Sequence, residues 1–205
     1  MLNILTIPAG PLNVNCYIVF NAENEKALII DPGGDFSLIN EALKGVNKQA
    51  GAVIVTHAHF DHVLAVGNFN EEKVPVYMCE KDFDFLTTHK NLAKYFGIKF
   101  KPFKVDKFLC ENSMEICSMN VKIYYTPGHT PGGVCLQIEN ALFTGDTLFK
   151  ESYGRTDFPD GDEKSLIQSI KKLFSIKENL TVYPGHNEKT TLDHEKKYNP
   201  ITLLF

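Results

Sequence analysis

The sequence lacks an apolar run near the roughly 20 residues needed to cross a membrane, and it lacks a basic start followed by an apolar core. Its five cysteines are scattered and include no Cys-x-x-Cys pair, which argues against a disulfide framework and a cysteine zinc site. A net charge of -4 provides no general attraction to nucleic-acid phosphates. We therefore expect a cytoplasmic protein with reduced thiols and with no nucleic-acid or membrane partner.

The size and composition of the chain are those of an ordinary globular protein. With 205 residues, of which 43% are hydrophobic and 22% charged, the chain can bury a substantial core. No internal repeat, low-complexity tract or linker marks a boundary, so we expect residues 1–205 to form one domain. Nothing in the sequence indicates an oligomeric state.

Short β-rich segments alternate with turns and with a few segments of helical spacing. Strands are expected at residues 2–8, 15–20, 26–34, 51–57, 74–80, 121–128, 133–140, 141–146 and 180–186. Helices are expected at residues 36–45, 62–70, 81–97 and 162–174. The three strands in quick succession after Val121 favour an antiparallel meander and hence a second sheet. The pattern predicts two sheets with helices packed outside them.

Histidine and aspartate side chains directly follow several of the apolar strands, and three histidines fall within the stretch THAHFDH at residues 56–62. Seven side chains able to bind metal share this position: His57, His59, Asp61, His62, His129, Asp146 and His186. Strand ends hold loops in place, so ligands far apart in sequence converge if their strands are neighbours. Five histidines and two aspartates suit zinc, iron or manganese and suffice for two ions.

Several polar residues near this set admit more than one interpretation. His89 and His194 lie in charged helical surroundings, so we interpret them as solvated residues outside the site. Asp31 precedes a Pro-Gly-Gly turn and fits a turn residue as well as a partner of the metal ligands. Candidates to hydrogen-bond the histidines and fix their tautomers are Thr56, Thr126, Thr130 and Thr144.

Four motifs, THAHFDH, PGHTPG, FTGDTLF and PGH, occur in order over nearly the whole chain and resemble the metallo-β-lactamase superfamily. The resemblance implies the fold of that superfamily, a four-layer αββα sandwich of the α/β (α+β) class. It also implies two divalent metal ions per chain, one held by His57, His59 and His129, the other by Asp61, His62 and His186, with Asp146 bridging them. Zinc is the expected metal, and iron and manganese are alternatives.

Three further segments, NCYIV, GRTDFPDGD and TTLDHEKKYNP, resemble the glyoxalase II-like (hydroxyacylglutathione hydrolase-like) branch in its short, stand-alone bacterial form. This implies hydrolysis of a small thioester, such as S-lactoylglutathione, through a metal-bridging hydroxide that Asp61 also orients. Glyoxalase II carries a C-terminal helical domain that supplies basic residues to glutathione, and we expect this chain to lack it. Arg155 is a candidate to bind an acidic substrate, or it pairs with Asp157 or Asp160 to brace its loop.

The segment GRTDF also resembles the persulfide dioxygenases of the same superfamily, which use one iron. By that resemblance His57, His129 and Asp146 hold the iron and leave positions open for oxygen and a persulfide. The cysteine that often precedes the Gly-Arg pair in those enzymes is Tyr153 here, which favours the hydrolase.

Overall fold

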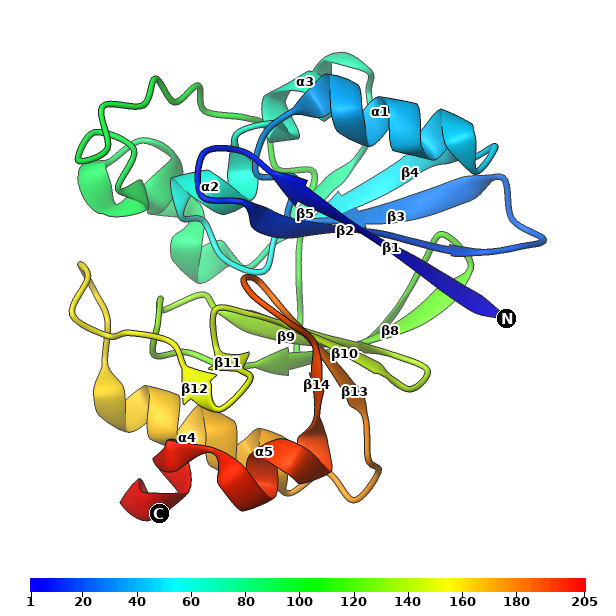
Figure 1. Ribbon diagram of the computed structural model, residues 1–205. Helices are drawn as coiled ribbons and strands as arrows, with labels where there is room; N and C mark the ends of the chain where they lie inside the picture. The colour runs from blue at the N-terminus through cyan, green and yellow to red at the C-terminus, as the bar shows by residue number, and fades with distance from the viewer.

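The computed structural model of the chain describes residues 1–205 and contains two six-stranded sheets that face each other (Figure 1). The first sheet has the order β1-β2-β3-β4-β5-β6, with strands at Leu2–Ala9, Val14–Asn21, Lys26–Ile30, Gln49–Ile54, Val76–Met78 and Lys107–Phe108. The second sheet has the order β14-β13-β10-β9-β8-β7. Its strands are β7 (Asn112–Ile116), β8 (Met119–Tyr125), β9 (Val134–Ile138), β10 (Ala141–Gly145), β13 (Thr181–Pro184) and β14 (Thr190–Thr191). A small hairpin joins β11 (Leu148–Phe149) to β12 (Ser152–Tyr153).

Helices cover the outer face of each sheet. The α-helices are α1 (Phe36–Gly45), α2 (Phe60–Val63), α3 (Val66–Glu71), α4 (Glu163–Phe174) and α5 (Leu192–Tyr198). Figure 1 shows α1 and α3 over the first sheet, and α4 and α5 over the second. The expected four-layer αββα sandwich is therefore confirmed. None of the helices combines the length and the apolar character that a membrane crossing needs.

The alternation of side chains along the strands explains why the layers pack in this order. In β2, Ile18 points to the core beneath α1, whereas Tyr17 and Val19 point to the core between the two sheets. In β10, Leu142 packs toward α4 and Phe143 packs between the sheets. Because both faces of these central strands are covered, they read as continuous apolar runs in the sequence.

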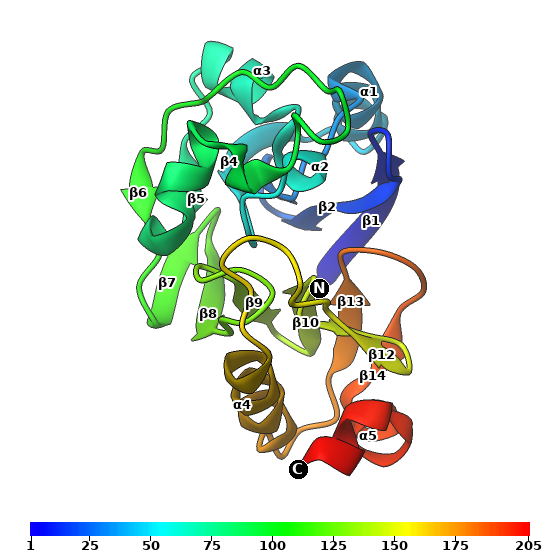
Figure 2. The same ribbon diagram turned by 90° about the vertical axis from the view of Figure 1, so that its left-hand side faces the viewer.

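Strand direction brings the loops of the second sheet to one edge. β8 is antiparallel to β9, β9 is antiparallel to β10, and β10 is parallel to β13, so β8, β10 and β13 all run the same way. Their carboxyl ends therefore share an edge, beside α2, which follows β4 of the first sheet. Figure 2 looks toward this edge, with α2 above and the loop after β12 below it.

The prediction of one long helix at residues 81–97 is wrong. This segment forms two short 3₁₀ helices, η1 (Glu80–Leu86) and η2 (His89–Asn91), followed by turns; a third, η3 (Pro200–Leu204), ends the chain. The Thr88 hydroxyl accepts the N–H of Lys90 and starts η2 anew, and Leu92, with φ 67°, ends it. Local side-chain bonding and tertiary contacts thus outweigh the helical spacing. The single helix expected at 62–70 likewise divides into α2 and α3.

Candidate metal centre

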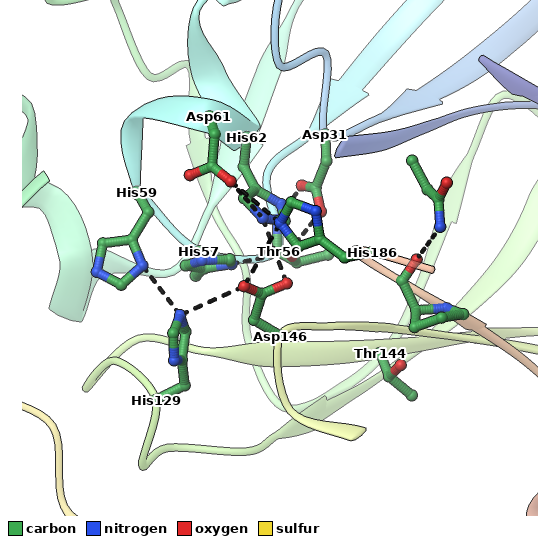
Figure 3. Close-up of polar contacts among 12 residues, drawn as sticks. Asp31, Thr56, His57, His59, Asp61, His62, His129, Thr144, Asp146 and His186 are labelled. Carbon is green, nitrogen blue, oxygen red and sulfur yellow. Dashed lines mark hydrogen bonds and ion pairs between the residues drawn. The ribbon is translucent and has the colours of Figure 1, made fainter. Parts of the chain in front are cut away.

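Side chains from four loops converge at this edge of the sandwich (Figure 3). They fall into three overlapping groups whose ligand atoms lie within 4.8 Å of one another: His57, His59 and His129; Asp61, His62 and His186; and His57, His62 and Asp146. Asp146 lies between the first two groups, because its Oδ1 is 3.4 Å from His62 Nε2 and its Oδ2 is 3.6 Å from His129 Nε2. The structure thus brings together all seven residues that the sequence indicates.

The local sequence explains how one short stretch supplies four of these side chains. After β4 the chain bends at Thr56 and His57, and His59 precedes α2 in an extended conformation with φ -67° and ψ 146°. The first turn of α2 then carries Asp61 and His62. An extended segment that turns into a helix can aim several side chains into one space, which neither element does alone.

Glycine is required at two points where the loops approach the centre. Gly145 has φ +47°, and a Cβ there would lie 2.4 Å from Thr56 Oγ1. A Cβ on Gly185 would lie 2.3 Å from Asp146 Oδ1. A side chain at either position would displace the carboxylate or the loop that holds it.

The hydrogen-bonding state of the cluster tests whether it fits metal ions. His57 Nε2, His62 Nε2 and Asp146 Oδ1 are buried and have no hydrogen-bond partner, although an unsatisfied buried polar group costs about 1–3 kcal/mol. All three atoms belong to one of the groups with ligand atoms within 4.8 Å. Imidazole nitrogens and carboxylate oxygens are the ligands that zinc, iron and manganese accept. The residues present therefore fit divalent metal ions.

Electrostatics favour a cation at the same place. Burial lowers the pKa of His57 well below its usual value and that of His59 to about 3, so both are neutral at pH 7, the form that binds metal. Burial by itself would raise the pKa of Asp146. The neighbouring His62 has the opposite and larger effect, so the pKa of Asp146 lies well below its usual range. Burial lowers the pKa of His62, yet the surrounding carboxylates raise it well above its usual value. The carboxylates thus attract positive charge to the centre.

Asp31, with φ 51° before the Pro-Gly-Gly turn, also hydrogen-bonds to residues of the cluster. Its carboxylate accepts the backbone N–H of Thr56 at 2.7 Å and the Thr56 hydroxyl at 2.6 Å, and it lies 2.9 Å from His62 Nδ1. Thr56 Oγ1 in turn lies 3.3 Å from His57 Nδ1. His129 Nδ1 lies 2.7 Å from the carbonyl oxygen of Arg155, which turns Nε2 toward the centre, where it lies 2.9 Å from His59 Nδ1.

A family model described as the Metallo-beta-lactamase superfamily matches residues 9–186. The chain belongs to this superfamily. It is 32% identical over 208 residues to "Hydroxyacylglutathione hydrolase GloC" of Haemophilus influenzae, with 98% of each chain covered. Among solved structures it is similar to the BLEG-1 B3 metallo-beta-lactamase (TM-score 0.90, 35% identity, 98% of each chain) and to TTHA1623 in a di-iron-bound form (TM-score 0.86, 33% identity, 96% of this chain and 98% of that one).

A pocket of about 400 Å³ opens from the candidate metal centre to solvent. His59, Asp61, His129, Asp146 and His186 line it together with Leu12, Phe60, Leu92, Phe96, Phe149, Tyr153, Arg155 and Phe158. The guanidinium of Arg155 donates from Nε and Nη2 to Asp157 at 2.6 and 2.5 Å, and it stacks over Phe158 with 4.1 Å to the ring centroid. Asp160, the other acid considered for Arg155, pairs with Lys90 instead.

The sequence analysis did not identify the fully buried Asp82, which lies beside the candidate metal centre. Its carboxylate accepts the backbone N–H of Ala58 at 3.1 Å, the hydroxyl of Thr130 at 2.8 Å and the backbone N–H of Gly132 at 2.6 Å. Asp82 therefore ties the loop of His57 and His59 to the loop of His129. It follows Lys81 in a run of mixed charges, where no spacing or motif distinguishes it from a surface acid.

The two histidines that were excluded lie outside the centre. His194 Nε2 is 2.9 Å from Glu151 Oε1 in a partly exposed pair, and His89 belongs to η2. Of the four threonine candidates, Thr56 contacts a ligand histidine, whereas Thr144 donates to the carbonyl oxygen of Leu148.

Proposed function

We propose that this protein is a binuclear metallohydrolase of the glyoxalase II-like type, which hydrolyses a small thioester such as S-lactoylglutathione. The observation that carries the proposal is the pair of three-residue groups with the Asp146 carboxylate between them. The relative named hydroxyacylglutathione hydrolase in Haemophilus influenzae supports the choice of substrate. We also propose a cytoplasmic location, which the five free thiols support.

In this proposal His57, His59 and His129 hold one ion, Asp61, His62 and His186 hold the other, and Asp146 contacts both. When bound, two divalent ions lower the pKa of a water toward neutrality and polarise a carbonyl group. Zinc is the expected metal; iron remains an alternative because the relative TTHA1623 has been described in a di-iron-bound form.

The chain's own residues prepare the reaction around this pair of ions. Burial acts to raise the pKa of Asp61, but His62 and the contact with His186 lower it below its usual value, so the carboxylate stays ionised. Asp61 lines the pocket, where it can accept a hydrogen bond from the attacking water and orient it. Apolar side chains, among them Phe60 and Phe158, form much of the pocket wall beside Asp61.

Elemental analysis of the purified protein, followed by a thioester assay, tests the proposal. Close to two zinc ions per chain and hydrolysis of S-lactoylglutathione or a simpler thioester are expected. A fully metal-loaded protein that cleaves no thioester would contradict it. Protein should be prepared both with and without a chelation step. Elemental analysis of the two preparations then distinguishes metal bound in the expression host from metal added after purification.

The second candidate is a mononuclear iron persulfide dioxygenase with His57, His129 and Asp146 as ligands. The proximity of these three residues supports this candidate. His129 Nε2 lies 3.6 Å from Asp146 Oδ2, and the ring centroids of His57 and His129 are 4.9 Å apart. Two histidines and one carboxylate form a common iron-binding set. A single iron per chain and oxygen uptake with glutathione persulfide would favour this function over hydrolysis.

A further inference from the structure

Side chains far apart in the sequence build apolar walls around the mouth of the metal centre. Leu12 comes from the β1–β2 turn, Phe60 from α2, Phe96 from the turns after η2, and Phe158 from the loop after β12. Leu12 is 40% exposed and Phe96 51% exposed, although large apolar side chains favour burial. Apolar surface that gathers at a concave site marks a place where a ligand is bound.

The charge on these walls is small. Arg155 is the single lysine or arginine that lines the pocket, and Asp157 already neutralises it through two hydrogen bonds. Its planar group also lies against Phe158, so its own face is covered. Glutathione presents two carboxylates, and recognition of carboxylates in proteins relies on free cations or backbone donors. The pocket walls offer no unpaired cation for them.

The size of the pocket limits what can accompany the reacting carbonyl. A volume of about 400 Å³ is near the lower end of the range of roughly 300–1,000 Å³ for small-molecule sites. A cavity of roughly 150 Å³ holds one benzene ring, so an aromatic acyl group fits beside the apolar walls with room left for part of the carrier thiol. A short hydroxyacyl group leaves most of the apolar surface in contact with water.

We propose that this pocket selects thioesters whose acyl group is apolar and of aromatic size, with a carrier thiol that needs no charge recognition. The inference rests on the proposed hydrolysis and names its substrate class. In the reaction, the oxygen of water forms a bond to the acyl carbon and the carbon–sulfur bond breaks. The products are an apolar carboxylic acid and the carrier thiol, which takes up a proton.

Matched thioesters test the preference directly. For zinc-loaded protein, kcat/KM is measured with S-phenylacetyl-N-acetylcysteamine, S-lactoyl-N-acetylcysteamine and S-lactoylglutathione. The phenylacetyl ester is expected to exceed the lactoyl ester of the same thiol by about tenfold or more, as for other apolar pockets. The kcat/KM values of the two lactoyl esters are expected to agree within about threefold, because the pocket has no unpaired cation to bind the carboxylates of glutathione. A faster reaction with S-lactoylglutathione than with the phenylacetyl ester would overturn the inference.

Two variants test whether the preference for an apolar acyl group comes from Phe96 in the pocket wall. Phe96→Ala is expected to reduce the ratio of phenylacetyl to lactoyl kcat/KM about fivefold or more, because it removes a ring from the pocket. The neighbouring Tyr95 does not line the pocket and is 72% exposed, so Tyr95→Ala should leave the ratio unchanged. Both side chains are at least half exposed, so both variants are expected to fold.

Binding of the product acid separates the two proposals. By calorimetry, phenylacetate should bind the protein more tightly than lactate, and Phe96→Ala should remove the difference. If this binding pattern appears but no thioester is cleaved, the hydrolase proposal fails and the pocket preference stands. If thioesters are cleaved without acyl preference and Phe96→Ala changes nothing, the pocket preference fails and the hydrolase stands.

Discussion

The carboxylate of Asp82 accepts the backbone N–H of Gly132 at 2.6 Å, 50 positions away in the chain. The same carboxylate accepts the N–H of Ala58, between two ligand histidines, and the hydroxyl of Thr130, next to a third. One buried side chain thus fixes the separation of two loops that, in the proposed assignment, hold the same ion. Its importance lies in geometry, because Asp82 does not belong to any of the metal-binding groups.

Replacement of Asp82 by alanine should weaken both folding and metal binding. The variant leaves three donors without their acceptor, which should lower the free energy of unfolding by about 3 kcal/mol. Zinc affinity should fall about 10–100-fold, the usual effect of losing a group that orients metal ligands. Urea unfolding and competition with a chromogenic chelator measure these two quantities. Asp84→Ala is the control, because Asp84 is an exposed partner of Lys90; equal losses in both variants would contradict the role.

The pH dependence of stability should carry a signature of Asp82. Burial raises its pKa to about 6, whereas an unfolded aspartate titrates near 3.9. A carboxyl with a raised folded-state pKa stabilises the fold fully below the unfolded pKa and loses this contribution as pH rises through about 6. The free energy of unfolding of the wild type minus that of Asp82→Asn should therefore fall by about 3 kcal/mol between pH 4 and 7. Urea unfolding in chelator at both pH values measures it, and a constant difference would refute the prediction.

Zinc should stabilise the protein strongly, because His57 Nε2, His62 Nε2 and Asp146 Oδ1 are buried without hydrogen-bond partners. At free zinc about 1,000-fold above the dissociation constant, stability should rise by about 4 kcal/mol, and chelator should reverse the gain. Asp146→Ala and His129→Ala should lose most of this shift and abolish hydrolysis while their far-ultraviolet circular dichroism stays native. His194→Ala serves as the matched histidine control, since His194 pairs with Glu151 outside the centre. Full turnover by either ligand variant would show that the assigned site is wrong.

Asp31→Asn should affect one part of the centre more than the other. The amide keeps the size of the side chain but places a donor where Asp31 accepts from Thr56 and His62. Zinc affinity at the group with His62 should decrease about 10–100-fold, while the group with His59 changes less. Titration with zinc, read as two successive binding steps, tests this. Asp35→Asn, at an exposed position beyond the same turn, should retain both steps.

The sequence was sufficient for the long strands and for the seven convergent side chains. β2 and β3 are largely apolar and rich in β-branched residues, and β10 is buried along its whole length. Strands with both faces covered require such runs. The convergence of the seven side chains could be predicted because histidines and aspartates follow strands at motif spacing. Both signals are local, so they can be read without knowing the partners of each strand.

Features that depend on distant partners could not be predicted. Two-residue strands such as β6, β11 and β14 exist through pairing with a neighbour and have no pattern of their own. The failed helix at 81–97 has helical spacing, but Asp82 and Phe85 in this segment are drawn into the buried interior. The apolar role of Phe96 at the pocket and the pairing of Arg155 with Asp157 likewise emerge only when the loops come together.

Each three-residue group draws two side chains from the loop of the first sheet and one from the second. His57 and His59 are joined by His129, and Asp61 and His62 are joined by His186. An ion in either position would therefore cross-link the two sheets, because its ligands come from both. In the proposed assignment neither half of the sandwich alone carries a complete set of ligands. Tight metal uptake would then follow only after the halves have docked, and metal retention would report that the sandwich is correctly assembled.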